Sequence, residues 1–285
     1  MKSRIIFALI CFCFLSCQNK VDISGLFYEP KVVVEGSIEN ENYASVLLSI
    51  SAPITGAQDT VSLLKQAIRS ALVAVSDGEI VDTLRLHLNR EKIPPYEYRG
   101  RLIKGEPGKT YSLRIEYAGN IITSTTHVPE PVELDNIWFK KKNETDTVGY
   151  IGVSFRNKSD EFYRLSTCPY SLRDVFTLCL YGNIDSRKYA KDEQINIELN
   201  RGPTIYPENN FSTYFVVTDT LRIKFSTQPE SAYKYWMSYQ NEVLNAQNAM
   251  FPAFSSLESN ISGGIGIWSG YGSSIYPVKL SDIEK

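Results

Sequence analysis

An alternation of apolar and polar side chains with a period of two is the feature that most restricts the fold of this chain. It is clearest in the segment YSLRIEY at residues 111–117, which lies between the turn-forming pairs Pro107-Gly108 and Gly119-Asn120. A period of two places every second side chain on the same face of a strand. Residues 111–117 are therefore predicted to form a β-strand with one buried face.

The same alternation recurs in short segments along most of the chain. These segments are residues 31–38, 46–51, 71–76, 84–88, 151–155, 195–199 and 221–225. Asp77-Gly78 favours a hairpin turn after the third segment, and Leu84, Leu86 and Leu88 are then expected on one face of the return strand. Short strands separated by turn signals predict a mostly β protein that begins with an antiparallel β-sandwich, immunoglobulin-like or transthyretin-like, over residues 31–128.

Two closely spaced prolines mark a boundary between domains. Pro129-Glu-Pro131 favours an extended connector that cannot join the interior of a sheet, because proline lacks the backbone N–H. A second β-rich domain is therefore predicted over residues 129–285.

This second domain is predicted to contain one helix, near residues 230–248. Pro229 suits a first helical turn. The apolar residues that follow at helical spacing are Ala232, Tyr235, Trp236, Tyr239 and Val243. Trp236 is accordingly expected in the core.

The N-terminus has the pattern of an export signal. Lys2 and Arg4 precede an apolar run at residues 5–15, which is shorter than the roughly 20 residues that span a bilayer. Residues 1–16 are therefore predicted to be a signal peptide. Leu15-Ser-Cys17 resembles a bacterial lipobox, which predicts lipidation of Cys17 and a tether over residues 17–30. An ordinary secreted protein, in which Cys17 has no special role, is the alternative.

Once the signal has been removed and Cys17 lipidated, Cys168 and Cys179 are the remaining cysteines. An even number of cysteines in an oxidising compartment is compatible with a disulfide. Two separate buried thiols are equally compatible with the sequence, and both interpretations stay open.

Charge and motifs exclude several classes of function. The 30 lysine and arginine residues nearly balance 32 aspartate and glutamate residues, so no nucleic-acid partner is expected. The two histidines, His87 and His127, cannot form a site that needs several histidines. No Gly-x-Ser-x-Gly motif is present, and Gly263-Gly-Ile-Gly266 lacks the third glycine of a dinucleotide loop. We expect no catalytic residues, no metal site and no cofactor.

Two aromatic residues near the C-terminus are candidates for contact with a ligand or partner. Trp268 and Tyr271 lie among Gly264, Gly266, Gly270 and Gly272, where few bulky neighbours surround them. The density of glycines suggests close approach of another sheet or of a partner. Burial in the core is the alternative for both aromatic side chains.

Several motifs occur in one order and carry a resemblance to a known family. They are the lipobox at Cys17, Val32-Val-Val-Glu-Gly36, Gly108-Lys-Thr-Tyr-Ser-Leu113, Tyr233-Lys-Tyr-Trp236 and Asn260-Ile-Ser-Gly-Gly264. Together they resemble Bacteroidetes outer-membrane lipoproteins that carry the domain of unknown function DUF4249. The resemblance implies an anchored, β-rich protein, often encoded beside TonB-dependent receptors, and it implies no catalytic residues.

The leading hypothesis for function is a non-enzymatic lipoprotein, attached to the outer membrane by its lipid. It would assist a TonB-dependent receptor in nutrient binding or uptake. One alternative is a free-standing glycan-binding or adhesive surface module. Another is a hydrolase with paired carboxylates, since such a pair needs proximity only in space. Whether the protein faces the periplasm or the outside is left open.

Overall fold

The structure is a computed structural model of the chain. It describes residues 29–51, 64–92, 94–173, 175–202, 211–245 and 257–284. The predicted signal peptide, the lipidated Cys17 and most of the tether lie outside these residues. Residues 31–285 form one compact unit.

The largest sheet has eight strands, in the order β12-β11-β15-β16-β1-β2-β6-β5. From the first part of the chain come β1 (Val32–Glu39), β2 (Tyr43–Ile50), β5 (Arg85–Leu88) and β6 (Tyr96–Lys104). From the second part come β11 (Phe162–Pro169), β12 (Thr177–Asp185), β15 (Thr220–Gln228) and β16 (Ile265–Lys279). Neighbouring strands are antiparallel except β1 and β16, which are parallel.

Each half of the large sheet packs on a smaller sheet. The first smaller sheet contains β4 (Val81–Thr83), β3 (Leu72–Ser76), β7 (Thr110–Tyr117) and β8 (Asn120–His127), in that order. In the second, β10 (Val148–Arg156) pairs with β9 (Asn136–Lys141), β13 (Gln194–Leu199) and β14 (Phe215–Val216). The mostly β fold is confirmed, and its two layers of sheet in each half are sandwich-like.

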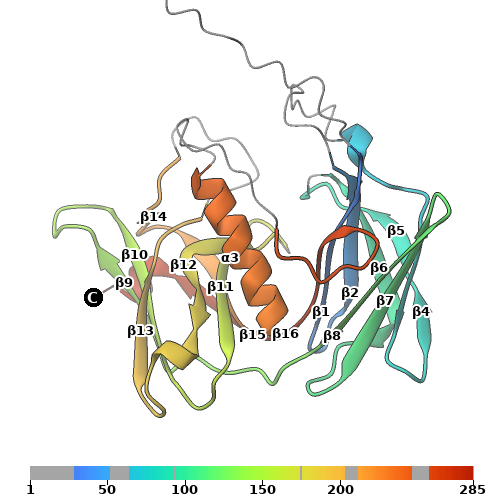
Figure 1. The fold of residues 1–285 in the computed structure, drawn as a ribbon. Helices are drawn as coiled ribbons and strands as arrows, with labels where there is room; N and C mark the ends of the chain where they lie inside the picture. The colour runs from blue at the N-terminus through green and yellow to red at the C-terminus, as the bar shows by residue number, and fades with distance from the viewer. Residues whose placement is uncertain are drawn as a thin grey trace, which may run out of the picture. The chain divides into compact units, whose positions relative to one another are not determined.

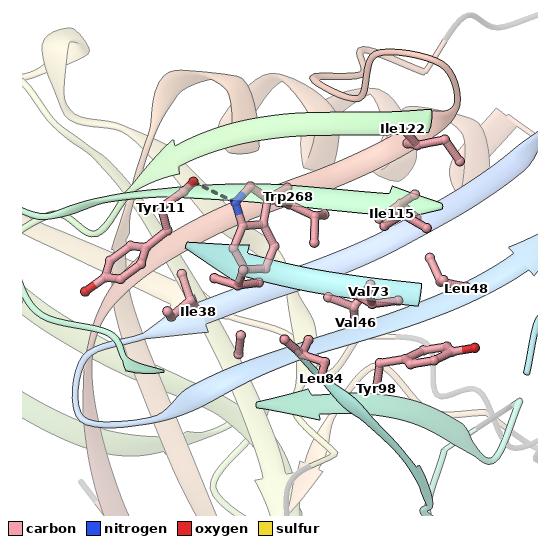
Figure 2. Close-up of a cluster of buried hydrophobic side chains, with 14 of the residues drawn as sticks. Ile38, Val46, Leu48, Val73, Leu84, Tyr98, Tyr111, Ile115, Ile122 and Trp268 are labelled. Atoms are coloured by element: carbon pink, nitrogen blue, oxygen red, sulfur yellow. Dashed lines mark hydrogen bonds between the residues drawn. The ribbon is translucent and has the colours of Figure 1, made fainter. Parts of the chain in front are cut away.

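Alternation along the strands produces two hydrophobic clusters between the sheets, and a third, smaller cluster lies between the large sheet and the late helix. The first cluster lies between β1, β2 and β6 on one side and β3, β7 and β8 on the other, and it includes Val46, Ile115 and Trp268 (Figure 2). The second includes Phe155 of β10 and Phe225 of β15. Each of these two clusters contains residues from both of its sheets, so each half of the fold has its own core.

Strand β16 connects the two halves. Its residues Ile265 to Tyr271 pair with β1, and residues Gly272 to Lys279 pair with β15. The connector at residues 128–135, which contains Pro129-Glu-Pro131, lies outside the strands between β8 and β9. The division into two domains at these prolines stays a prediction, and β16 is the strand that both halves share.

The return strand after Asp77-Gly78 differs from the expectation. The chain forms β4 beside β3, then leaves that sheet and continues as β5 beside β6. Leu84 is buried at this crossing, whereas Leu86 and Leu88 are 39% and 57% exposed. The predicted common face of Leu84, Leu86 and Leu88 is therefore wrong, because the chain changes sheets within the segment.

The predicted late helix is confirmed as α3 (Glu230–Asn245). The carbonyl of Pro229 accepts hydrogen bonds from the backbone N–H groups of Ala232 and Tyr233 at its start. The helix packs against β16, β11 and β12 (Figure 1). Its residues Ala232, Tyr235 and Trp236 are buried. Among the residues that the structure describes, no helix is long and apolar enough to cross a membrane.

Candidate ligand-binding cleft

A cavity of about 480 Å³ lies on the face of the large sheet that carries α3. We call it the cleft. Its walls come from β1, β2, β6, β11, β12, β15, β16 and α3, so both halves of the fold contribute to it.

The alternation of side chains along each strand places some residues in the two cores and their neighbours in the cleft. In β1, Val34 points into the first core, while Glu35 lines the cleft. In β11, Leu165 points into the second core, while Arg164 lines the cleft. Adjacent residues of a strand face opposite sides of the sheet. One face of the large sheet therefore carries the cores, and the other carries the cleft.

An aromatic and guanidinium cluster forms the side of the cleft next to α3. The indole Nε1 of Trp236 donates a hydrogen bond to the hydroxyl of Tyr271, at 2.8 Å. The Arg164 guanidinium carbon lies 4.0 Å from the Trp236 ring centroid, and Nη1 of Arg164 donates to the same Tyr271 hydroxyl at 3.2 Å. Cation–π stacking and these hydrogen bonds hold the three side chains in one arrangement.

Tyr235 and Tyr239 extend this cluster along the helix. Tyr235 is buried, and Tyr239 is 44% exposed. Burial raises the pKa of both phenols, and the negative charge of Glu35 raises the pKa values further. Both hydroxyls are therefore protonated at neutral pH and can donate hydrogen bonds.

Glu39 and Glu97 form ion pairs on the floor of the cleft. Nζ of Lys224 lies 2.9 and 3.0 Å from the two carboxylate oxygens of Glu39, and 4.0 Å from the Phe176 ring centroid. Glu97 pairs with Lys92 and accepts a hydrogen bond from Ser45 at 3.1 Å.

The Glu97 carboxylate is ionised by this environment. Burial alone would raise its pKa, but the charge of Lys92 and the hydrogen bonds from Lys92, Ser45 and Asn89 outweigh burial. The pKa of Glu97 is consequently below its usual value. Such a carboxylate is a fixed charge, not a proton donor, near neutral pH.

The structure separates Trp268 from Tyr271. Trp268 is completely buried in the first core, where its Nε1 donates to the carbonyl of Tyr111 at 3.1 Å (Figure 2). The prediction that Trp268 contacts a ligand or partner is therefore wrong, because no part of its side chain reaches the surface. Trp268 is a core residue. Tyr271, three residues later, faces the opposite side of the sheet, where it is 4% exposed, packs against Trp236 and lines the cleft.

The glycines near these residues do mark a close approach, and the approaching backbone belongs to the chain itself. A Cβ on Gly270 would lie 2.0 Å from the carbonyl oxygen of His127. A Cβ on Gly272 would lie 2.2 Å from the carbonyl oxygen of Pro129. The connector therefore crosses β16 at a distance that only glycine permits.

Cys168 and Cys179 are both buried free thiols. Nη2 of Arg222 lies 3.3 Å from the Cys168 sulfur, and the Cys179 sulfur lies 3.9 Å from the Thr167 hydroxyl oxygen. Burial raises the pKa of Cys179 to about 12, so this sulfur is a protonated thiol. Of the two interpretations that the sequence left open, the structure contains separate thiols.

Sequence patterns missed the most informative cleft residue, Arg164. Its segment, Phe162–Pro169, carries no turn signal or charge pattern that distinguishes it from other strands. Trp236 was expected in the core and is buried, but its ring also stacks on the Arg164 guanidinium at the side of the cleft.

Both histidines are exposed, and no group of three or more metal-ligating side chains occurs within the described ranges.

The model of the family described as Domain of unknown function (DUF4249) matches residues 19–275. No curated protein matches the chain. The family match covers both halves of the fold and every residue of the cleft named above.

Proposed function

Because the chain belongs to the DUF4249 family, for which no function is established, we propose a function from the cleft and the N-terminal sequence together. The protein is a non-enzymatic, lipid-anchored binding protein of the outer membrane. It assists a TonB-dependent receptor by binding a nutrient in the cleft. The anchor rests on the lipobox at Cys17, the receptor rests on the resemblance, and the binding activity rests on the cleft.

The observation that carries the binding activity is the composition of the cleft. Its volume of about 480 Å³ is in the range of small-molecule sites, roughly 300–1,000 Å³. Aromatic side chains on the helix side supply apolar surface, and the ion pairs on the floor supply hydrogen-bonding groups at fixed positions. A mainly apolar wall with a few oriented polar groups is typical of a ligand site.

The charges of the cleft favour binding over hydrolysis. A glycosidase needs one carboxylate that holds its proton at neutral pH and a second that is ionised. Glu97 has a lowered pKa, and Glu39 is in bidentate contact with Lys224. Lysine partners therefore already compensate two of the three cleft carboxylates, and the third, Glu35, is exposed.

The alternative of a free-standing glycan-binding module differs in where its aromatic residues should lie. An adhesive module needs an exposed aromatic platform, whereas Trp236, Tyr235 and Tyr271 are each less than one-tenth exposed at the side of a cleft. The recessed position favours capture of a small ligand over adhesion to a polymer surface.

Two measurements test the proposal. The lipidated protein is purified from outer membranes, and co-purification of a TonB-dependent receptor is expected; repeated recovery without any receptor would contradict the accessory role.

Separately, the protein is incubated with a low-molecular-mass extract of growth medium and the retained compounds are measured by native mass spectrometry. Ser37→Trp, which fills the cleft, should abolish retention, whereas Ser112→Trp on the exposed face of β7 should not.

A further inference from the structure

Not every charged side chain of the cleft has an ion-pair partner. Glu97 pairs with Lys92 and, at 3.9 Å between Nη1 and Oε1, with Arg99, while Lys224 pairs with Glu39. Arg164 has no carboxylate partner among the described residues, and its Nε is buried without a hydrogen-bond partner. A guanidinium that is partly removed from water and has no counter-ion is costly unless a ligand supplies one.

The Arg164 guanidinium is also held in a fixed orientation before any ligand binds. Trp236 supports it from one face at 4.0 Å, and the Tyr271 hydroxyl accepts from its Nη1. Trp236 in turn fixes the Tyr271 hydroxyl through its indole N–H. A guanidinium fixed in this way is suited to a charge-assisted hydrogen bond with an oxygen of a carboxylate or phosphate.

Glu35 is the other charged side chain of the cleft without an ion pair in the described ranges. It is exposed to solvent on β1, and its charge acts on Tyr235 and Tyr239. Counting Lys92, Arg99, Arg164 and Lys224 against Glu35, Glu39 and Glu97 gives four positive and three negative charges, a net charge of +1 in the cleft. Lys92 and Arg99 together supply the excess beside Glu97. Arg164 is the cation of the cleft without a carboxylate partner in the described part of the chain, and it is the position at which an anionic ligand would be bound.

We propose that the ligand of the cleft carries an anionic oxygen group, a carboxylate or a phosphate, which binds Arg164. The body of the ligand lies along the aromatic side chains of α3, beside Tyr239. This inference rests on the proposed binding function and specifies the chemical class of the ligand.

The test uses pairs of probes that differ only in the anionic group, titrated calorimetrically into the full-length protein at low salt. The pairs are trigalacturonate with galactotriose, N-acetyltyrosine with its amide, and glucose 6-phosphate with glucose. In at least one pair, the acid should bind about tenfold or more tightly than the neutral compound, the ratio typical of hydrogen bonds to a charged group. A tighter binding of trigalacturonate or N-acetyltyrosine indicates a carboxylate ligand, and a tighter binding of glucose 6-phosphate indicates a phosphate.

Variants connect the preference to Arg164. Arg164→Met should remove the difference between acid and neutral compound, and Arg164→Lys should keep part of it, because lysine retains the charge but not the planar fork. Tyr271→Phe preserves the ring and removes the hydroxyl that positions Arg164, so it should reduce the preference without loss of fold. Arg114→Met, at an exposed ion pair on β7, is the matched control.

Equal binding of the acid and the neutral compound in every pair would overturn the inference, as would a preference for the acid that survives in Arg164→Met. Failure of every probe to bind at concentrations up to about 10 mM would also overturn it. None of them would contradict the proposed function, because retention of a compound by wild-type protein and its loss in Ser37→Trp do not depend on the charge of the ligand. If the wild-type protein retains no compound in the mass-spectrometric experiment and binds no probe in the calorimetric experiment, both proposals are contradicted.

Discussion

At the scale of single residues, the buried side chains divide into those that pack and those that hold charge. Trp268 is the clearest packing residue, because its ring is fully buried and its N–H is satisfied by Tyr111. We expect Trp268→Ala to lower the free energy of unfolding by about 3–5 kcal/mol, measured by urea denaturation. A change below about 1 kcal/mol, the cost of an exposed position, would contradict the core assignment.

Glu97 makes stability depend on pH. Its pKa in the folded protein is lower than in the unfolded chain, so its contribution is present above the unfolded value of about 4.5 and is lost as the pH falls through the folded value. Glu97→Gln should therefore be less stable than wild type at pH 7, by about 1–3 kcal/mol, and this difference should shrink on acidification below about pH 4.5.

Urea denaturation at several pH values between roughly 3 and 7 measures this difference. The matched control is Glu116→Gln, which removes an exposed carboxylate that pairs with Arg114. Exposed ion pairs contribute little, so the control should follow wild type at every pH. A constant difference between Glu97→Gln and wild type over the whole range would refute the assigned role of Glu97.

At the scale of elements, glycine positions in β16 determine how the connector crosses the sheet. The carbonyl oxygens of His127 and Pro129 leave no room for a Cβ on Gly270 or Gly272. Because backbone atoms cannot move as a flexible side chain can, Gly270→Ala should cost about 1–3 kcal/mol or more by thermal or chemical denaturation. Ser274→Ala in the same strand is the control and should be nearly neutral, since serine already carries a Cβ.

Individual elements were also the level at which sequence patterns were most informative. Alternation in β7, β10, β13 and β15, and helical spacing in α3, are local consequences of having one buried face. The change of sheet at Leu84 was not predictable from alternation, because both sheets impose the same period of two. It depends on contacts with β3 and β6, which come from other parts of the chain.

At the scale of the whole molecule, pairing between distant segments determines both the sheet and the cleft. The parallel pairing of β1 with β16 joins Val33 to Ile265, near opposite ends of the folded chain. The cleft depends on it, because Glu35 on β1, Arg164 on β11 and Tyr271 on β16 lie in one sheet only when β1 pairs with β16. No local pattern marks these residues as a group, so the mostly β class and one residue of the cleft, Tyr271, were predictable from the sequence, whereas Glu35 and Arg164 were not.

The shared strand leads to a prediction about cooperativity. Deletion of residues 265–285 removes Trp268 from the first core, Leu280 from the second, and the pairing partner of both β1 and β15. Both halves should therefore lose their folded structure, even though the deleted segment comes last in the chain. Amide hydrogen exchange measured by mass spectrometry should show protection lost in β7 as well as in β10. If β7 kept native protection, the first half would fold without β16, and the two cores would be coupled only through the connector.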